Sequence, residues 1–157
     1  MRKPRLALGF FALLIGCLVN YIGDRIIGVR IELWWGLQTF YDPLWFLQLF
    51  IWPVVVGFVV AAIFGIGGKW LCYFPPMIVR SIAYFEMVYL RDIPDGAALI
   101  PFGWWLFYVI LAVECAAIGG VFGEAMIKRV YGRTSPEEAD KIYLKPEKNN
   151  NEASPSE

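Results

Sequence analysis

The chain has 157 residues, of which 59% are hydrophobic and 17% aromatic, and its 14 basic residues balance its 14 acidic residues. Zero net charge gives no electrostatic basis for nucleic-acid binding, and the absence of histidine excludes His-ligated haem, the usual imidazole metal sites and histidine acid–base catalysis. Soluble domains are less apolar, at about 45–50%. The composition therefore predicts an integral membrane protein with a single domain.

Four apolar stretches predict four transmembrane helices, so the fold class is an all-α integral membrane protein. The polytopic domain covers residues 1–133 and residues 134–157 form a cytoplasmic tail. The predicted spans are residues 5–22, 44–66, 70–90 and 101–127.

The first span follows a basic N-terminus, MRKPR, and has the pattern of a signal peptide or signal anchor. Leu14 to Cys17 also fits a lipobox, in which the cysteine becomes a lipidated N-terminus, and lipidation of Cys17 is left open. Leu18 and Val19 continue the apolar run without a polar tether. We therefore predict an uncleaved span.

Residues 23–43 are too charged to cross a bilayer and more apolar than an ordinary loop. Their two tryptophans are typical of a segment that lies in the lipid headgroup zone. Two interpretations stay open, an ordered loop packed on the bundle and an interfacial docking surface. The docking surface would use Arg30, Glu32, Trp34 and Trp35.

The second span contains small residues four positions apart, at Gly57, Ala61 and Gly65. Residues at this spacing lie on one face of a helix and allow another helix backbone to approach closely. Pro53, in the same span, predicts a kink.

The third span is the least regular, because it contains a Pro75–Pro76 pair and two charged residues. Its alternative is a helix lying flat on the membrane surface. With four spans, seven basic residues lie on the N-terminal side of the membrane and three on the other side. The positive-inside rule then places both termini in the cytoplasm. We predict a multi-pass protein of a bacterial-type inner membrane.

The last span carries small residues on one side and Glu114 on the opposite side. Lipid favours neither a glycine seam nor a carboxylate, so both sides should meet protein or water. We predict that a second polypeptide covers one of them; the alternative is that the glycines only allow tight packing within one chain. The small residues of this side are Ala112, Ala116, Gly119, Gly120 and Gly123.

Arg80 and Glu114 lie near the midpoints of the third and fourth spans. In consecutive antiparallel helices the two charges would share one depth, which predicts an intramembrane ion pair. Glu114 has two other interpretations, a proton or cation site along a wet path and a general acid or base.

Beyond the spans, Ser135, Pro136 and Glu138 form a good helix start, which predicts a short helix as far as Tyr143 or Leu144 and then disorder. Cys17, Cys72 and Cys115 lie far apart in apolar segments and are predicted to act as small buried hydrophobes.

No nucleophile motif, phosphate loop or nucleotide fingerprint occurs in the sequence, so we predict no catalytic residue, metal or cofactor. The favoured function is a non-catalytic integral-membrane subunit or scaffold of a larger inner-membrane complex, or a homo-oligomer. Its partners would be the lipid bilayer and other membrane subunits. The alternative is an ion- or proton-coupled transporter or channel component that uses Glu114.

Overall fold

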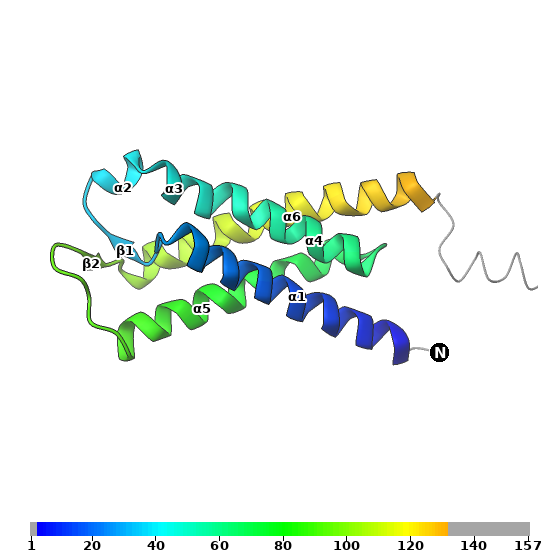
Figure 1. Ribbon diagram of the computed structural model, residues 1–157, viewed down its shortest axis with the longest axis horizontal. Helices are drawn as coiled ribbons and strands as arrows, with labels where there is room; N and C mark the ends of the chain where they lie inside the picture. The colour runs from blue at the N-terminus through cyan, green and yellow to red at the C-terminus, as the bar shows by residue number, and fades with distance from the viewer. Residues whose placement is uncertain (1–2, 132–157) are drawn as a thin grey trace, which may run out of the picture.

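In the computed structural model, which describes residues 3–131, four helical rods lie side by side in one elongated bundle (Figure 1). The first rod is a single helix and the second combines three helical segments. The third joins a 3-10 helix to an α-helix, and the fourth is again a single helix. The rods are α1 (Lys3–Ile27); α3 (Pro43–Phe46), the π-helix η1 (Leu47–Ile51) and α4 (Trp52–Phe64); the 3-10 helix η2 (Gly68–Tyr73) and α5 (Phe74–Tyr89); and α6 (Phe102–Tyr131).

Successive rods run in opposite directions, so α4 and α6 are parallel to each other and antiparallel to α1 and α5 (Figure 1). The start of α1 and the end of α6 therefore lie at the same end of the bundle. The other end holds α2 (Gln38–Tyr41) and a two-stranded antiparallel sheet, in which β1 (Leu33–Trp34) pairs with β2 (Ala98–Leu99). The connection between α4 and η2 is short, which makes these two elements antiparallel neighbours.

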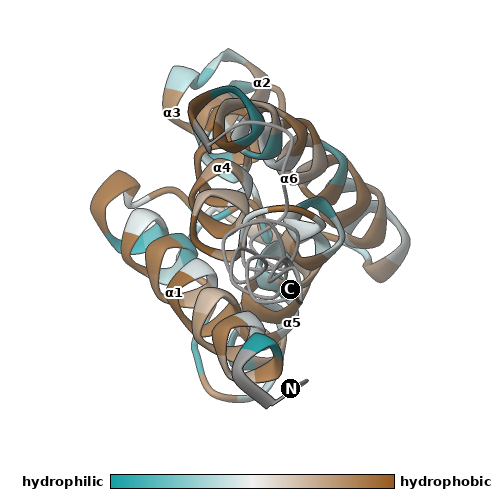
Figure 2. Cartoon of the chain, turned by 90° about the vertical axis from the view of Figure 1, so that its right-hand side faces the viewer, coloured by the Kyte–Doolittle hydropathy of each residue, from teal (hydrophilic) through white to brown (hydrophobic). Residues whose placement is uncertain are grey.

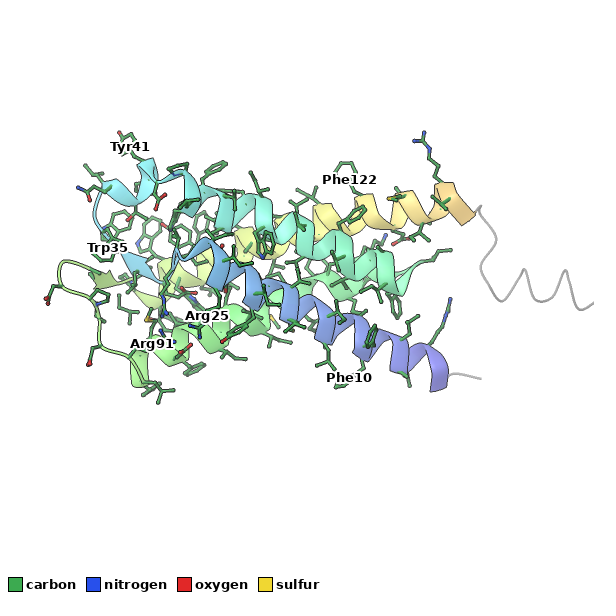
Figure 3. All side chains as sticks on the ribbon, viewed as in Figure 1. Phe10, Arg25, Trp35, Tyr41, Arg91 and Phe122 are labelled. Carbon is green, nitrogen blue, oxygen red and sulfur yellow. The ribbon has the colours of Figure 1, made fainter. Side chains whose placement is uncertain are left out.

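Three helical stretches are long and apolar enough to cross a membrane, residues 5–27, 43–64 and 102–130. They agree with the predicted spans 5–22, 44–66 and 101–127. Hydrophobic residues cover most of the rods when the bundle is viewed along its length (Figure 2). Phe10 and Phe122 project outward on opposite sides and are more than 60% exposed (Figure 3). The chain is therefore a mostly helical membrane protein.

The predicted third span, residues 70–90, falls on η2 and α5 and is not among these three stretches. Its α-helix has only 16 residues, because η2 precedes it as a tighter 3-10 helix. Pro75 and Pro76 lie in the first turn of α5, where the missing N–H groups cost no helical hydrogen bond.

A π-helical stretch, η1, ends at Ile51, two residues before Pro53. Proline removes one N–H and its ring crowds the carbonyl group four residues earlier, which is Leu49. Wider π-type hydrogen bonding around Leu49 gives this ring room.

Residues 23–43 are divided among several elements. The first five continue α1 as far as Ile27, and the chain then turns at Gly28, which has a φ of 73°. Ile31, Glu32 and Leu33 are buried, and β1 is hydrogen-bonded to β2. This segment is an ordered connection packed on the bundle. The predicted tail, residues 134–157, lies outside the described residues.

The small-residue seams of α4 and α6 face each other within the chain. A Cβ atom added to Gly57 would overlap the carbonyl oxygen of Ala116, and one added to Gly119 would overlap that of Val54. At Gly123 an added Cβ would lie 2.8 Å from the Phe58 carbonyl oxygen. The two helices therefore approach closely only because these positions lack side chains.

The predicted use of this seam by a second polypeptide is thus corrected. Ala112 and Ala116 are at most 1% exposed, Ala61 is fully buried, and the α6 seam is already occupied by α4. Gly120 lies against Cys72 of η2. Gly65 is not part of the seam: its φ of 81° ends α4, and no atom lies within 4 Å of an added Cβ.

Candidate functional site

Arg80 on α5 is the centre of a buried charged cluster. Its Nη2 donates to Oδ1 of Asp24 at 2.5 Å, and its Nη1 donates to Oε1 of Glu32 at 3.2 Å. Gln48 of η1 donates its Nε2 hydrogen to the same Asp24 oxygen. The cluster therefore ties α1, the residue before β1, η1 and α5 together.

The predicted Arg80–Glu114 ion pair is corrected by this geometry. The Arg80 side chain is 3% exposed and bound by Asp24 and Glu32, whereas Glu114 is exposed on the outer surface of α6. Because the seam of α6 faces α4, the opposite side of the same helix points away from the bundle. Equal depth does not bring two side chains together when their helix faces diverge.

Two carboxylates share one guanidinium in this cluster, so it carries one negative charge in excess when both are ionised. Buried ion pairs contribute little net stability, because desolvation offsets the attraction, but removing one partner leaves an uncompensated buried charge. The cluster therefore fixes which helix faces meet. Asn20, one turn before Asp24, is 1% exposed, and neither of its amide atoms has a partner among the described residues.

A cavity of about 100 Å³ lies beside this cluster, between α1 and α5. Its apolar wall includes Ile82, Ala83 and Met87 of α5. Two further guanidinium groups, those of Arg25 and Arg30, line it together with the cluster. It thus combines several charges with an apolar side.

The two arginines at this cavity have weak partners. Arg25 donates to the hydroxyl of Tyr21 at 2.9 Å and lies 5.2 Å from the centre of that ring. Arg30 donates to the thioether sulfur of Met87 at 3.4 Å, and a thioether is a poor acceptor. Neither guanidinium has a carboxylate partner in the described part of the chain, whereas Glu86 at the same cavity is paired with Arg91.

Glu114 occupies the middle of an apolar outer face of α6. The side chains one and two turns away along this face are about half exposed: Phe107 49%, Ile110 51%, Ile118 52% and Val121 55%. Within residues 3–131 the Glu114 carboxylate has no hydrogen bond and no salt bridge. It lines neither the cavity between α1 and α5 nor a second cavity near β1, whose lining includes Gly28, Thr39 and Trp45.

The four residues of the predicted docking surface are dispersed. Arg30 lines the cavity, Glu32 is 2% exposed beside Arg80, and Trp34 packs edge-to-face on Phe40 at 5.1 Å. Of these four residues only Trp35 is largely accessible, at 45%, and it lies at the end of the bundle that holds the two-stranded sheet (Figure 3).

No protein-family model, curated protein or solved structure matches this chain.

Sequence reasoning missed the Asp24–Arg80–Glu32 cluster, because Gly23-Asp24-Arg25 resembles the end of a helix. A signal was nevertheless available: Asp24 lies one turn after Asn20, on one face of an extended first helix.

Within the described residues, no group of three or more His, Cys, Asp or Glu side chains could hold a metal ion. The three cysteines are free thiols in the structure, and Cys72 donates to the carbonyl oxygens of Gly57 and Gly68 at 3.1 Å each. The remaining chemical features are a buried charge cluster, a charged cavity and the exposed Glu114 carboxylate on the apolar face of α6.

Proposed function

We propose that this chain is a non-catalytic, multi-pass subunit of a larger inner-membrane complex. The observation that carries this proposal is the exposed Glu114 carboxylate in the middle of an apolar helix face. The small-residue seam no longer supports it, because that seam is filled by the chain itself.

The fourth span of this proposal is η2 together with α5. A 3-10 helix rises about 2.0 Å per residue and an α-helix about 1.5 Å, so these two elements cover about 36 Å, which exceeds the hydrocarbon thickness of about 30 Å. They run alongside the other three rods over most of the bundle (Figure 1). Four spans and the distribution of basic residues then place both termini in the cytoplasm.

Glu114 lies within about two residues of the midpoint of α6, which is about 3 Å along the helix axis. An ionised carboxylate at the centre of a bilayer costs about 2.5–3.5 kcal/mol on insertion scales. Its neighbours on this face are apolar, and no charge of the described chain neutralises it. A partner helix with a lysine or arginine at the same depth would remove this cost.

A different polypeptide fits this surface better than a second copy. The basic residue nearest the middle of the rods is Arg80, which is buried and already bound to two carboxylates. A second copy of this chain would therefore bring either another Glu114 or an apolar surface to the contact, and neither would neutralise the carboxylate. We therefore propose a heteromeric assembly.

The test compares affinity purifications of a tagged chain in mild detergent. Glu114→Leu should lose its co-purifying membrane partner by about tenfold or more, because a charged pair at this depth exceeds about 1.4 kcal/mol. Glu86→Gln is the matched control, because it removes a carboxylate already paired with Arg91 within the chain. Full retention of every partner by Glu114→Leu would contradict the proposal.

The alternative is a proton- or ion-coupled transport component that uses Glu114. It predicts that Glu114→Gln abolishes a pH-dependent flux while assembly is unchanged. The position of Glu114 outside the described cavities favours the subunit instead. Flux loss with normal co-purification would favour the transporter.

A further inference from the structure

The charged groups in and beside the cavity between α1 and α5 carry a net positive charge. The cavity's three carboxylates belong to Asp24, Glu32 and Glu86, and each is already bound to a guanidinium. Three guanidiniums, those of Arg25, Arg30 and Arg80, line the cavity with these carboxylates, and Arg91 beside the cavity neutralises Glu86, so the group as a whole carries one positive charge. The uncommitted groups are those of Arg25 and Arg30, whose present partners are a phenol and a thioether.

The depth of this cavity corresponds to the boundary between acyl chains and headgroups. Arg25 lies two residues before the end of the apolar stretch at Ile27, about 3 Å along the axis. The polar zone on each side of a bilayer is about 5–8 Å thick. The guanidinium of a side chain at the end of a span reaches this zone easily.

The other wall of the cavity is apolar and continues onto the outer surface. Ile82 lines the cavity and is 62% exposed, and Ala83 and Met87 lie next to it on α5. A small hydrophilic anion would gain nothing from this wall. A molecule with an anionic head and an apolar chain would use both parts.

We infer that this cavity binds the phosphodiester of an anionic membrane phospholipid, with the phosphate on Arg25 and Arg30 and an acyl chain along Ile82 and Ala83. A phosphodiester carries a single negative charge, which equals the excess charge of the site. Guanidinium groups bind phosphate oxygens through paired, charge-assisted hydrogen bonds. A cavity of about 100 Å³ holds several water-sized groups, enough room for a phosphate.

The experiment measures lipid retention by native mass spectrometry of the full chain in mild detergent. The chain is titrated with phosphatidylglycerol, phosphatidylcholine and inorganic phosphate. Wild type should retain one phosphatidylglycerol at least about tenfold more strongly than phosphatidylcholine, because choline cancels the headgroup charge. Equal retention of the two lipids, or displacement of phosphatidylglycerol by millimolar inorganic phosphate, would overturn a lipid site.

The double variant Arg25→Gln/Arg30→Gln should lower phosphatidylglycerol retention by about tenfold or more. The matched control is the double variant Glu86→Gln/Arg91→Gln, which removes a guanidinium at the same end of the bundle together with the carboxylate that it binds, so the charge balance is unchanged. This control should therefore retain the lipid. Wild-type retention by a folded Arg25→Gln/Arg30→Gln variant would contradict the assignment.

Ala83→Phe provides an independent test that leaves every charge in place. The added ring would occupy the apolar side of the cavity and exclude the acyl chain, so retention should also fall. This variant decides the matter if Arg25→Gln/Arg30→Gln does not fold, because unchanged retention in Ala83→Phe would overturn the acyl-chain site. Circular dichroism in the same detergent establishes that each variant is folded.

Discussion

Arg80 of α5 and Asp24 of α1 are joined by a 2.5 Å hydrogen bond although 56 positions separate them in the sequence. The bond holds the middle of the third rod against the far end of the first. Glu32 binds the other terminal nitrogen of the same guanidinium, so the connection after α1 is fixed to the same point. One buried arginine thus holds both α1 and the connection that follows it.

Replacing Arg80 with methionine should destabilise the chain by about 3–5 kcal/mol, because Asp24 and Glu32 would remain buried without a counter-charge. Adding Asp24→Asn and Glu32→Gln removes that charge and should restore a substantial part of the loss. The measurement is the free energy of unfolding in detergent micelles, followed by circular dichroism.

The matched comparison is Arg80→Met with Glu114→Gln. Because Glu114 does not contact Arg80, its neutralisation should restore none of the stability lost in Arg80→Met beyond the effect that Glu114→Gln has by itself. Rescue of Arg80→Met by Glu114→Gln, but not by the Asp24 and Glu32 changes, would contradict the observed cluster.

The sequence predicted the positions of the helices but not this buried cluster. Apolar runs located the helices closely, because hydrophobic length is a property of each segment alone. The cluster depends on where α1 ends and on helix rotation, and neither follows from hydropathy. Asp24 and Arg25 resembled a loop, yet α1 continues through them to Ile27.

The face of Glu114 was predictable in part. Angular positions along α6 placed Glu114 opposite the small-residue seam, and the structure fills that seam with α4. What the sequence left open was which neighbour occupies the seam. Which neighbour packs there depends on how two distant segments fit together, for example at the contact between Gly57 and Ala116. No local sequence pattern encodes this fit.

Gly119→Ala should destabilise the chain by about 1–3 kcal/mol, because the added methyl would overlap the Val54 carbonyl oxygen and separate α4 from α6. Gly103→Ala is the matched control on the same helix. Nothing lies within 4 Å of its added Cβ, and alanine favours a helix interior over glycine by up to about 1 kcal/mol.

The two alanine substitutions should therefore change the free energy of unfolding in opposite directions. Equal effects would show that the α4–α6 contact is looser than in the structure. If the seam bound a partner, Gly119→Leu and Gly123→Leu would release the partner and leave the chain folded. Because the seam is filled by α4, both variants should instead unfold the chain. Their effect should already be visible in the isolated protein.

A lipid-soluble maleimide should distinguish the three cysteines in the folded chain. Cys72 is fully buried and hydrogen-bonded to two backbone carbonyl groups, whereas Cys17 and Cys115 are partly exposed. Mass spectrometry of the intact protein should show two adducts before denaturation and three afterwards. Modification of Cys72 in the folded chain would contradict the close packing of η2 on α6.

The proposed fourth span can be tested by single cysteines at its two ends. Lys69 precedes α5 and Asp95 follows it, and both residues are exposed. If η2 and α5 cross the bilayer, a membrane-impermeant maleimide added to intact cells should label Asp95→Cys but not Lys69→Cys, relative to the unsubstituted parent. Lys69→Cys should become reactive only after the cytoplasmic face is opened, because the basic residues at that end favour the cytoplasm. A helix lying on the membrane surface would place both cysteines on one side, so equal labelling from outside, or from inside alone, would exclude the crossing.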